Sequence, residues 1–273
     1  WLHDCGKVAT PPHVVDKGMK LETITDRIEV MDTRFEVLKR DAEISMLKKQ
    51  IELMQKGSVN GALESLKTDL DEQINQLSDD QTFIQKTNRG GEFMEEKDQQ
   101  RVADIGNYKW NLEGEEITLF DEKDVRNLQI PKGTLLPEER EIINDHIVIT
   151  IDMLEKLPYP KNLRNVPEFA GGHHEKLDGT GYPKGLKDED MSIQAKIMAI
   201  ADIYEALTAA DRPYKDGKKL SQAMRIMGFM KKDYEIDEDL FEIFVKNQVY
   251  KQYAEKYLGE NQLDEVDEAS VLA

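Results

Sequence analysis

The chain has 273 residues, of which 39% are hydrophobic and 34% charged, a balance that fits a helical protein of one or two domains with long solvated helices. Its net charge of −18 argues against non-specific binding to nucleic acid polymers or anionic membranes, so a phosphate ligand would need a local positive site. The single cysteine, Cys5, excludes an intrachain disulfide and fits a reducing, cytoplasmic compartment, and no apolar run approaches the roughly 20 residues that span a membrane.

The first strong pattern is helical and runs from Asp26 to Lys56. Apolar residues recur there in steps of three and four, at Ile28, Met31, Phe35, Leu38, Ile44, Leu47, Ile51 and Met54. "GSVNG" at 57–61 is typical of a turn, and the same period continues beyond it at Leu63, Leu66, Leu70, Ile74 and Leu77. We expect two antiparallel helices, a hairpin or short coiled coil that serves as a structural or dimerising arm.

The following segment, 87–132, is polar and broken by glycine, and "YKWNLEGEEITLF" within it predicts a short β-hairpin. Pro137 followed by acidic residues predicts the start of a helix that runs to about Leu157, and Ser192 is expected to cap a helix that ends at Ala210. "DGTGYPKGL" between them is a loop. Further helices are predicted over 166–174, 220–230 and 238–257, followed by a loose acidic tail from Glu260.

Histidine is scarce, and three of the five histidines lie in two short motifs. "HD" at 3–4 offers an imidazole and a carboxylate, and "HH" at 173–174 offers two imidazoles. Neighbouring side chains on a helix point about 100° apart, so two adjacent histidines rarely share one ion without a local bend. A tandem pair alone is therefore weak support for a metal site.

His146 and Asp202 are the other two candidates. His146 lies in the stripe Ile142, His146, Ile149, Met153, which we expect to face the core, where a lone histidine is usually only hydrogen-bonded. Asp202 has small or apolar helical neighbours, so its carboxylate is expected to be buried and to need a metal or an ion-pair partner such as lysine or arginine.

Together these residues form a candidate set of nitrogen and oxygen ligands: His3, Asp4, His146, His173, His174 and Asp202. Imidazole with carboxylate suits Fe, Mn or Zn, and one cysteine is too few for a structural zinc finger. The sequence contains no Walker loop, no GxGxxG and no nucleophile elbow.

"HDCGK" together with "HHEKLDGTGYP" resembles the HD-GYP phosphodiesterases, a branch of the HD metal-dependent phosphohydrolases. "LLPEEREIINDH" and "AIADIYEALTAADRPY" are similar to further segments of that family, and the resemblance covers residues 1–16 and 131–230. It implies an all-α fold, the HD-domain helical bundle, and a centre of two or three divalent ions, usually Fe or Mn. It also implies hydrolysis of a cyclic dinucleotide, chiefly cyclic di-GMP, to pGpG or GMP in bacterial signal transduction.

The resemblance also implies roles for individual residues. The six candidate ligands match the family's metal ligands, with Asp4 as the bridging carboxylate, and Lys7 matches the lysine near the metals and the scissile phosphate. Attack by metal-activated hydroxide on phosphorus would follow. The residues expected to contact substrate are Lys7, the GYP triplet Gly181, Tyr182 and Pro183, and the basic residues Arg212 and Lys215. For Tyr182, a packed loop aromatic is an equally good interpretation.

Two departures from the family pattern matter. Family members have helices before the HD motif that supply further metal ligands, so the chain resembles an N-terminally truncated fragment that could be inactive alone, with a sensory or inner-membrane-anchored domain upstream. The wide gap between Asp4 and His146 predicts an insertion. The predicted organisation is a split catalytic domain (1–17 and 131–258), an inserted helical hairpin (18–130) that could form a homodimer, and an acidic tail (259–273).

Other functions remain open at this point. A catalytically silent signalling or binding module would share the same motifs, although the intact ligands, Lys7 and GYP argue against a decayed site. An HD phosphohydrolase that acts on another nucleotide, such as cyclic GMP-AMP, is a further alternative.

Overall fold

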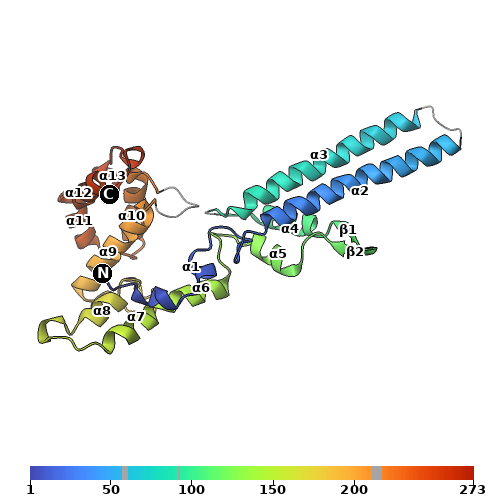
Figure 1. Ribbon diagram of the computed structural model, residues 1–273. Coiled ribbons are helices and arrows are strands. Elements are labelled where there is room, and N and C mark those ends of the chain that lie inside the picture. Colours follow the sequence, from blue (N-terminus) through green and yellow to red (C-terminus); the bar gives the residue numbers. More distant parts are fainter. Residues whose placement is uncertain (57–60, 92, 211–216) are drawn as a thin grey trace. The chain divides into compact units, whose positions relative to one another are not determined.

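The computed structural model describes residues 1–56, 61–91, 93–210 and 217–273 (Figure 1). The chain forms two compact units, and each is described by itself. Unit 1 consists of Trp1–Val15 and Glu138–Ala273, and unit 2 of Asp16–Pro137. That unit 2 is an insertion into a catalytic domain remains a prediction, and its predicted bounds are 18–130.

Unit 2 is dominated by the two long helices α2 (Ile28–Gln55) and α3 (Ala62–Asn88), which lie side by side in Figure 1. The expected helical hairpin is therefore confirmed, while most of the "GSVNG" turn lies outside the described residues. Met31 and Phe35 are fully buried and pack in one cluster with Leu77 and Ile84. Burial of four such side chains stabilises the base of the hairpin by about 1.5–3 kcal/mol each.

The segment between α3 and Pro137 is more ordered than its polar composition indicated. The expected β-hairpin is present as antiparallel β1 (Lys109–Leu112) and β2 (Glu115–Thr118), with Trp110 opposite Ile117. Two helices that the sequence analysis missed flank it, α4 (Glu96–Gly106) and α5 (Glu122–Leu128). Asp121 caps α5, because its side chain accepts from the Asp124 amide at 2.7 Å.

Unit 1 is helical in all its described elements, in agreement with the expected all-α class. The N-terminal segment contributes the 3-10 helix η1 (Cys5–Ala9) and the short α1 (Pro12–Val15). The later segment forms α6 (Pro137–Asn144), α7 (His146–Glu155), α8 (Val166–Gly171), α9 (Ile193–Thr208), α10 (Leu220–Lys232), α11 (Glu238–Lys246), α12 (Val249–Tyr257) and α13 (Glu268–Leu272). Short 3-10 turns lie at Lys161–Leu163, Asp188–Asp190 and Glu260–Gln262.

Three predicted elements of unit 1 are wrong in their extent. The single helix predicted from Pro137 to Leu157 is two helices, divided at Asp145, which is the N-cap of α7. The helix predicted over 238–257 is divided at Gln248, whose φ of 54° is left-handed and cannot continue a right-handed helix. The third, over 166–174, ends at Gly171, with Gly172 as its C-cap.

The acidic tail is not loose, contrary to the sequence prediction. Gln262 is buried and donates to the carbonyls of Thr208 and Lys218 at 2.7 and 3.1 Å. Val271 on α13 is 6% exposed and packs in the same core as Phe241. The tail is therefore packed against the rest of unit 1 through hydrogen bonds and a shared apolar core. Among the described helices, none combines the length and apolar character needed to cross a bilayer.

Candidate metal centre

The position of Asp4 is set by a close contact between η1 and α7. The Gly6 amide donates to Thr150 Oγ1 at 2.9 Å, and both groups are buried. A Cβ on Gly6 would lie 2.0 Å from the His146 carbonyl oxygen and 2.7 Å from the Thr150 amide nitrogen. Only glycine therefore lets the "HDCGK" segment lie against α7, and this contact brings Asp4 to His146 across 142 residues.

The Asp4 carboxylate is the centre of the cluster. Its Oδ1 lies 3.0 Å from His146 Nε2 and 3.6 Å from His173 Nε2. Its Oδ2 lies 2.5 Å from Lys7 Nζ and 3.6 Å from His3 Nε2. Burial opposes ionisation of Asp4, but hydrogen bonds from His146 and His173, where these rings carry a hydrogen on Nε2, and the Lys7 ammonium hold its pKa far below the usual range. The group is therefore a carboxylate at neutral pH.

The tautomers of two histidines follow from their backbone partners. Nδ1 of His146 lies 2.5 Å from the Ile143 carbonyl, and Nδ1 of His173 lies 2.6 Å from the Ala170 carbonyl. Because a carbonyl can only accept, each Nδ1 must carry the hydrogen, which leaves Nε2 of a neutral ring as an acceptor. Nε2 of His146 and Nε2 of His173 both face Oδ1 of Asp4, which can also only accept. The two imidazoles and the carboxylate therefore need a cation between them.

The packing of the imidazoles disfavours protons as that cation. His173 Nε2 is buried and has no hydrogen-bond partner. The rings of His173 and His174 are 4.2 Å apart, and burial, with the repulsion that a protonated His173 would add, lowers the pKa of His174 to about 4. Several adjacent imidazolium ions would repel one another, whereas a divalent ion satisfies all the lone pairs at once. The donor set therefore fits a metal.

Two groups of donor atoms have their members within 4.8 Å of one another: Asp4, His146, His173 and His174, and then His3, His173 and Asp202. The structure thus brings all six predicted ligands together in unit 1. His173 belongs to both groups but has one lone-pair nitrogen, because its Nδ1 donates to Ala170.

Asp202 on α9 is less buried than expected, with 22% of its side chain exposed. Its partner is His3, whose Nε2 lies 3.4 Å from Oδ1, in place of the anticipated lysine or arginine. Burial alone would raise the pKa of Asp202, but this contact holds it below its usual value. The same contact outweighs burial and raises the pKa of His3.

The stripe assigned to His146 does not face the core as a whole. His146 is 1% exposed, but Ile142 is 42% and Met153 41% exposed. The division at Asp145 places Ile142 on a different helix, and the buried face of α7 instead carries Ile147, Thr150 and Leu154. The expectation that this stripe faces the core is therefore wrong for Ile142 and Met153, although His146 itself is buried.

His173 and His174 lie in a turn and not on the predicted helix. The turn supplies the local bend that adjacent histidines need to meet one ion, because α8 ends at Gly171. A Cβ on Gly171 would lie 2.6 Å from the Ile151 side chain, so this glycine also lets α8 approach α7.

The GYP loop packs against these histidines. The Tyr182 ring stacks on His174 with centroids 4.8 Å apart, and burial raises the Tyr182 pKa to about 12. A Cβ on Gly181 would lie 2.3 Å from the Lys176 amide nitrogen, so Gly181 is required by the fold. The Tyr182–Pro183 peptide is cis. The packed-aromatic interpretation of Tyr182 therefore has direct support.

Sequence reasoning missed the residue that holds this loop. Glu175 is 2% exposed, and its two carboxylate oxygens accept from the amides of Lys184 and Leu186 at 2.7 and 2.8 Å. The sequence "HHEK" places this glutamate directly after the tandem histidines, but no sequence pattern indicated that its side chain is buried.

The basic residues expected at the substrate are only partly described. Lys7 contacts Asp4, while Arg212 and Lys215 lie outside the described residues. Arg140 on α6 was not predicted, and its charge opposes, without outweighing, the effect of burial on the Tyr182 pKa. Its signal was its place in "EEREII", six residues before His146.

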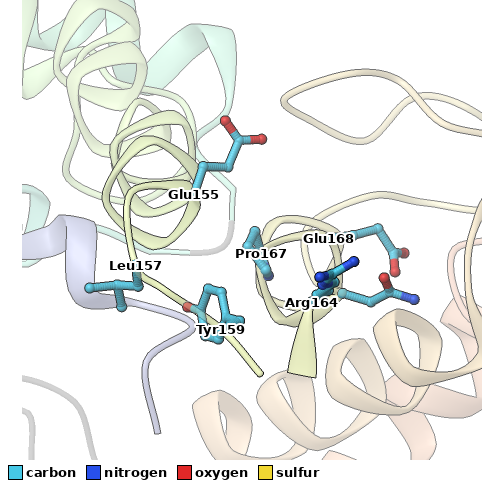
Figure 2. A pocket seen from close by; sticks show the side chains of 7 residues that line it. Glu155, Leu157, Tyr159, Arg164, Pro167 and Glu168 are labelled. Carbon is cyan, nitrogen blue, oxygen red and sulfur yellow. The ribbon is translucent and has the colours of Figure 1, made fainter. Parts of the chain in front are cut away.

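An open pocket of about 410 Å³ also lies in unit 1, between the ends of α7 and α8 (Figure 2). Figure 2 shows Glu155 on α7, Glu168 on α8, and Tyr159 in the segment between them. The residues that line this pocket include none of the predicted metal ligands. We assign the pocket no function.

Comparisons with known proteins agree with this geometry. Residues 123–240 match the HD domain family, a match that starts within α5. The chain is 40% identical over 96 residues to 3′3′-cGAMP-specific phosphodiesterase 1 of Vibrio cholerae, which covers 35% of this chain and 22% of that protein. It is 42% identical over 93 residues to a cyclic di-GMP phosphodiesterase of Thermotoga maritima, covering 34% of this chain and 25% of the relative.

A third relative is the cyclic di-GMP phosphodiesterase response regulator of Xanthomonas campestris, 46% identical over 133 residues, which cover 45% of this chain and 35% of the relative. The chain thus spans at most about a third of the length of these three relatives.

Proposed function

We propose that the chain acts as a metal-dependent phosphodiesterase that hydrolyses a cyclic dinucleotide, since residues 123–240 match the HD domain family and relatives named for that activity are similar to it. The observation that carries this proposal is the Asp4 carboxylate, toward which the lone pairs of His146 and His173 converge. The proposed substrate class comes from the names of the relatives, and the proposed metal dependence comes from the cluster of donor atoms.

We propose two or three divalent ions, Fe or Mn, which the donor group of Asp4, His146, His173 and His174 and the donor group of His3, His173 and Asp202 would hold. Imidazole with carboxylate suits these metals, and His173 would serve one group at a time. Ions held in this way would lower the pKa of a water molecule and neutralise charge on the phosphate. The buried rings of His146 and His173 keep their lone pairs fixed through their backbone hydrogen bonds.

The remaining residues bind and orient the substrate. Lys7 places an ammonium beside Asp4, where it would stabilise the charge that develops on the non-bridging oxygens. Tyr182 keeps its phenol protonated and covers His174, and it would limit the approach of the nucleotide to one side. Arg140, Arg212 and Lys215 are proposed to supply the positive charge that a chain of net charge −18 otherwise lacks.

Cyclic di-GMP is the proposed substrate and pGpG the proposed first product, with 3′3′-cGAMP as the nearest alternative, since relatives named for both are similar to this chain. An upstream sensory domain is the proposed partner and the cytoplasm the proposed location.

The test measures metal binding and hydrolysis on the same preparation. The chain is loaded with Mn(II), or anaerobically with Fe(II), its bound metal is counted by elemental analysis, and cyclic di-GMP and 3′3′-cGAMP are then added separately. Products are followed by chromatography. We expect linear dinucleotide from wild type and none from Asp4→Ala, because loss of Asp4 removes the carboxylate that faces His3, His146 and His173.

Asp239→Ala, on the exposed face of α11, is the matched control and should leave both readouts unchanged. Metal bound with neither nucleotide cleaved would contradict the proposal. Binding of a cyclic dinucleotide under those conditions would then favour a silent signalling module.

A further inference from the structure

The distal half of α2 carries a second apolar face. Ile44, Leu47, Ile51 and Met54, here called the outer stripe, are 47%, 51%, 55% and 57% exposed. In contrast, Met31, Phe35, Leu38 and Ala42 on the same helix are at most 9% exposed. Four large apolar side chains at steps of three and four, all half exposed, are more than the scattered apolar residues of an ordinary surface.

The outer stripe points away from α3. Met46 and Leu53 continue the partly buried side of α2 beyond Ala42. Each lies two residues after a member of the outer stripe, Ile44 or Ile51, which on an α-helix is a rotation of about 200°. α2 therefore has apolar residues on two opposite faces, one packed toward α3 within the hairpin and one without a partner in the described part of the chain.

The spacing of the outer stripe fits a coiled coil. Ile44 and Ile51 occupy a positions of a heptad, and Leu47 and Met54 occupy d positions. β-branched residues at a with leucine at d favour a parallel two-stranded coiled coil. The a positions further back are Val30 and Val37, but the d positions there are Thr33 and Arg40, so the apolar seam is confined to the last two heptads.

The flanking charges select the same arrangement. In a parallel pair, position g of one helix meets position e of the next heptad on the other, which here pairs Glu43 with Lys48 of the second copy, twice by symmetry. An antiparallel pair would set e against e, and because Lys48 lies near the middle of the outer stripe it would meet Lys48 of the other copy.

From these four features we propose that the outer stripe is the seam of a parallel homodimer, formed by α2 of two copies of this chain with α3 on the outside of each. Two heptads bury less than a standard interface, so the isolated chain forms a weak dimer, with a dissociation constant on the order of micromolar. The proposal does not depend on the phosphodiesterase activity.

The first test is the concentration dependence of the mass by light scattering. Wild type should pass from 31.4 kDa toward twice that mass as its concentration rises, and Leu47→Glu and Ile51→Glu should stay at 31.4 kDa. Ile243→Glu is the matched control, because Ile243 on α11 is also 55% exposed but lies outside the outer stripe. Circular dichroism verifies that the exposed substitutions leave the helices folded.

The second test reads the orientation. Glu43→Lys should weaken the dimer by on the order of tenfold, because it replaces two attractive pairs with two repulsive ones, and the double variant Glu43→Lys/Lys48→Glu should restore it. Ile51→Cys should cross-link under oxidation, since a positions face each other only in the parallel pair, while Ser45→Cys should match the wild-type background set by Cys5.

A monomer at every concentration up to about 100 µM would overturn the proposal, since a micromolar dimer would then be visible. A dimer that survives both Leu47→Glu and Ile51→Glu would also overturn it, because the seam would lie elsewhere. A dimer lost in those variants but insensitive to the charge reversals would retain the seam and overturn its parallel direction.

Discussion

At the scale of single residues, glycine and a buried glutamate do as much to build the donor cluster as the ligands themselves. Gly6 lets η1 touch the backbone of α7, and Gly181 lets the GYP loop touch the backbone at Glu175 and Lys176. The contacts are to backbone atoms, which cannot move aside as a flexible side chain can. Small changes at these positions should therefore have large effects on the centre.

Gly6→Ala tests the first contact. The added methyl group would overlap the His146 carbonyl, so we expect a loss of about 1–3 kcal/mol in the stability of unit 1, with a larger loss of metal affinity as Asp4 moves from His146. Thermal unfolding and a Mn(II) titration measure the two effects. Gly91→Ala is the control, because a Cβ there meets nothing within 4 Å. Equal effects of both substitutions would refute the packing argument.

Glu175→Gln tests the support of the GYP loop. The amide group can accept through only one oxygen, so one of the amides of Lys184 and Leu186 would face an N–H donor. We expect faster hydrogen exchange at these amides and a destabilisation of about 1–3 kcal/mol. Glu168→Gln, at an exposed position on α8, should change neither. Unchanged exchange in Glu175→Gln would show that the loop is held by other contacts.

At the scale of elements, the helix start at Ser192 was predicted from a local cap, while the divisions at Asp145 and Gln248 were not predicted. Ser192 was expected to begin a helix, and its hydroxyl accepts from the Ala195 amide at 3.2 Å at the start of α9. The divisions at Asp145 and Gln248 have no proline or glycine to mark them. The periodicity of the apolar residues therefore did not mark them.

Ser192→Ala measures the value of that cap. Loss of the hydroxyl leaves an N–H at the start of α9 without its partner, which should cost about 1 kcal/mol and lower the melting temperature of unit 1 by about 2–4 °C. Ser192→Asp should recover most of the loss, because a carboxylate accepts the same hydrogen bond. A melting temperature equal to that of wild type in Ser192→Ala would contradict the assigned cap.

The candidate site divides in the same way. The motif resemblance selected all six donors, because chemistry constrains which letters can bind a metal, and the structure brings them together. It did not reveal Thr150, which accepts from an amide 144 residues away, or Glu175, which accepts from amides 9 and 11 residues away. The order of the tail was also hidden, since Gln262 is fixed by carbonyls 44 and 54 residues away.

At the scale of the whole molecule, the donor cluster lies entirely in unit 1, so metal should stabilise one unit and not the other. By linkage, free metal at about 100 times its dissociation constant adds about 2.7 kcal/mol to the unit that binds it. We expect calorimetry with Mn(II) to raise the transition of unit 1 alone and EDTA to reverse the shift. The Asp4→Ala variant should show no shift. A rise of both transitions would mean that the units unfold as one.

The division of unit 1 into two chain segments has a consequence for biosynthesis. At about 5–20 residues per second, a ribosome needs roughly 7–28 s to travel from Asp4 to His146, and all of unit 2 emerges in that interval. Folding of unit 2 joins its own ends, since Thr134 donates to the Lys17 carbonyl at 3.0 Å. The nascent "HDCGK" segment is thereby held near the point where its partners will appear. A substitution in unit 2 that prevents the folding of that unit, and that contacts no metal ligand, would thus give a full-length chain without an assembled metal centre.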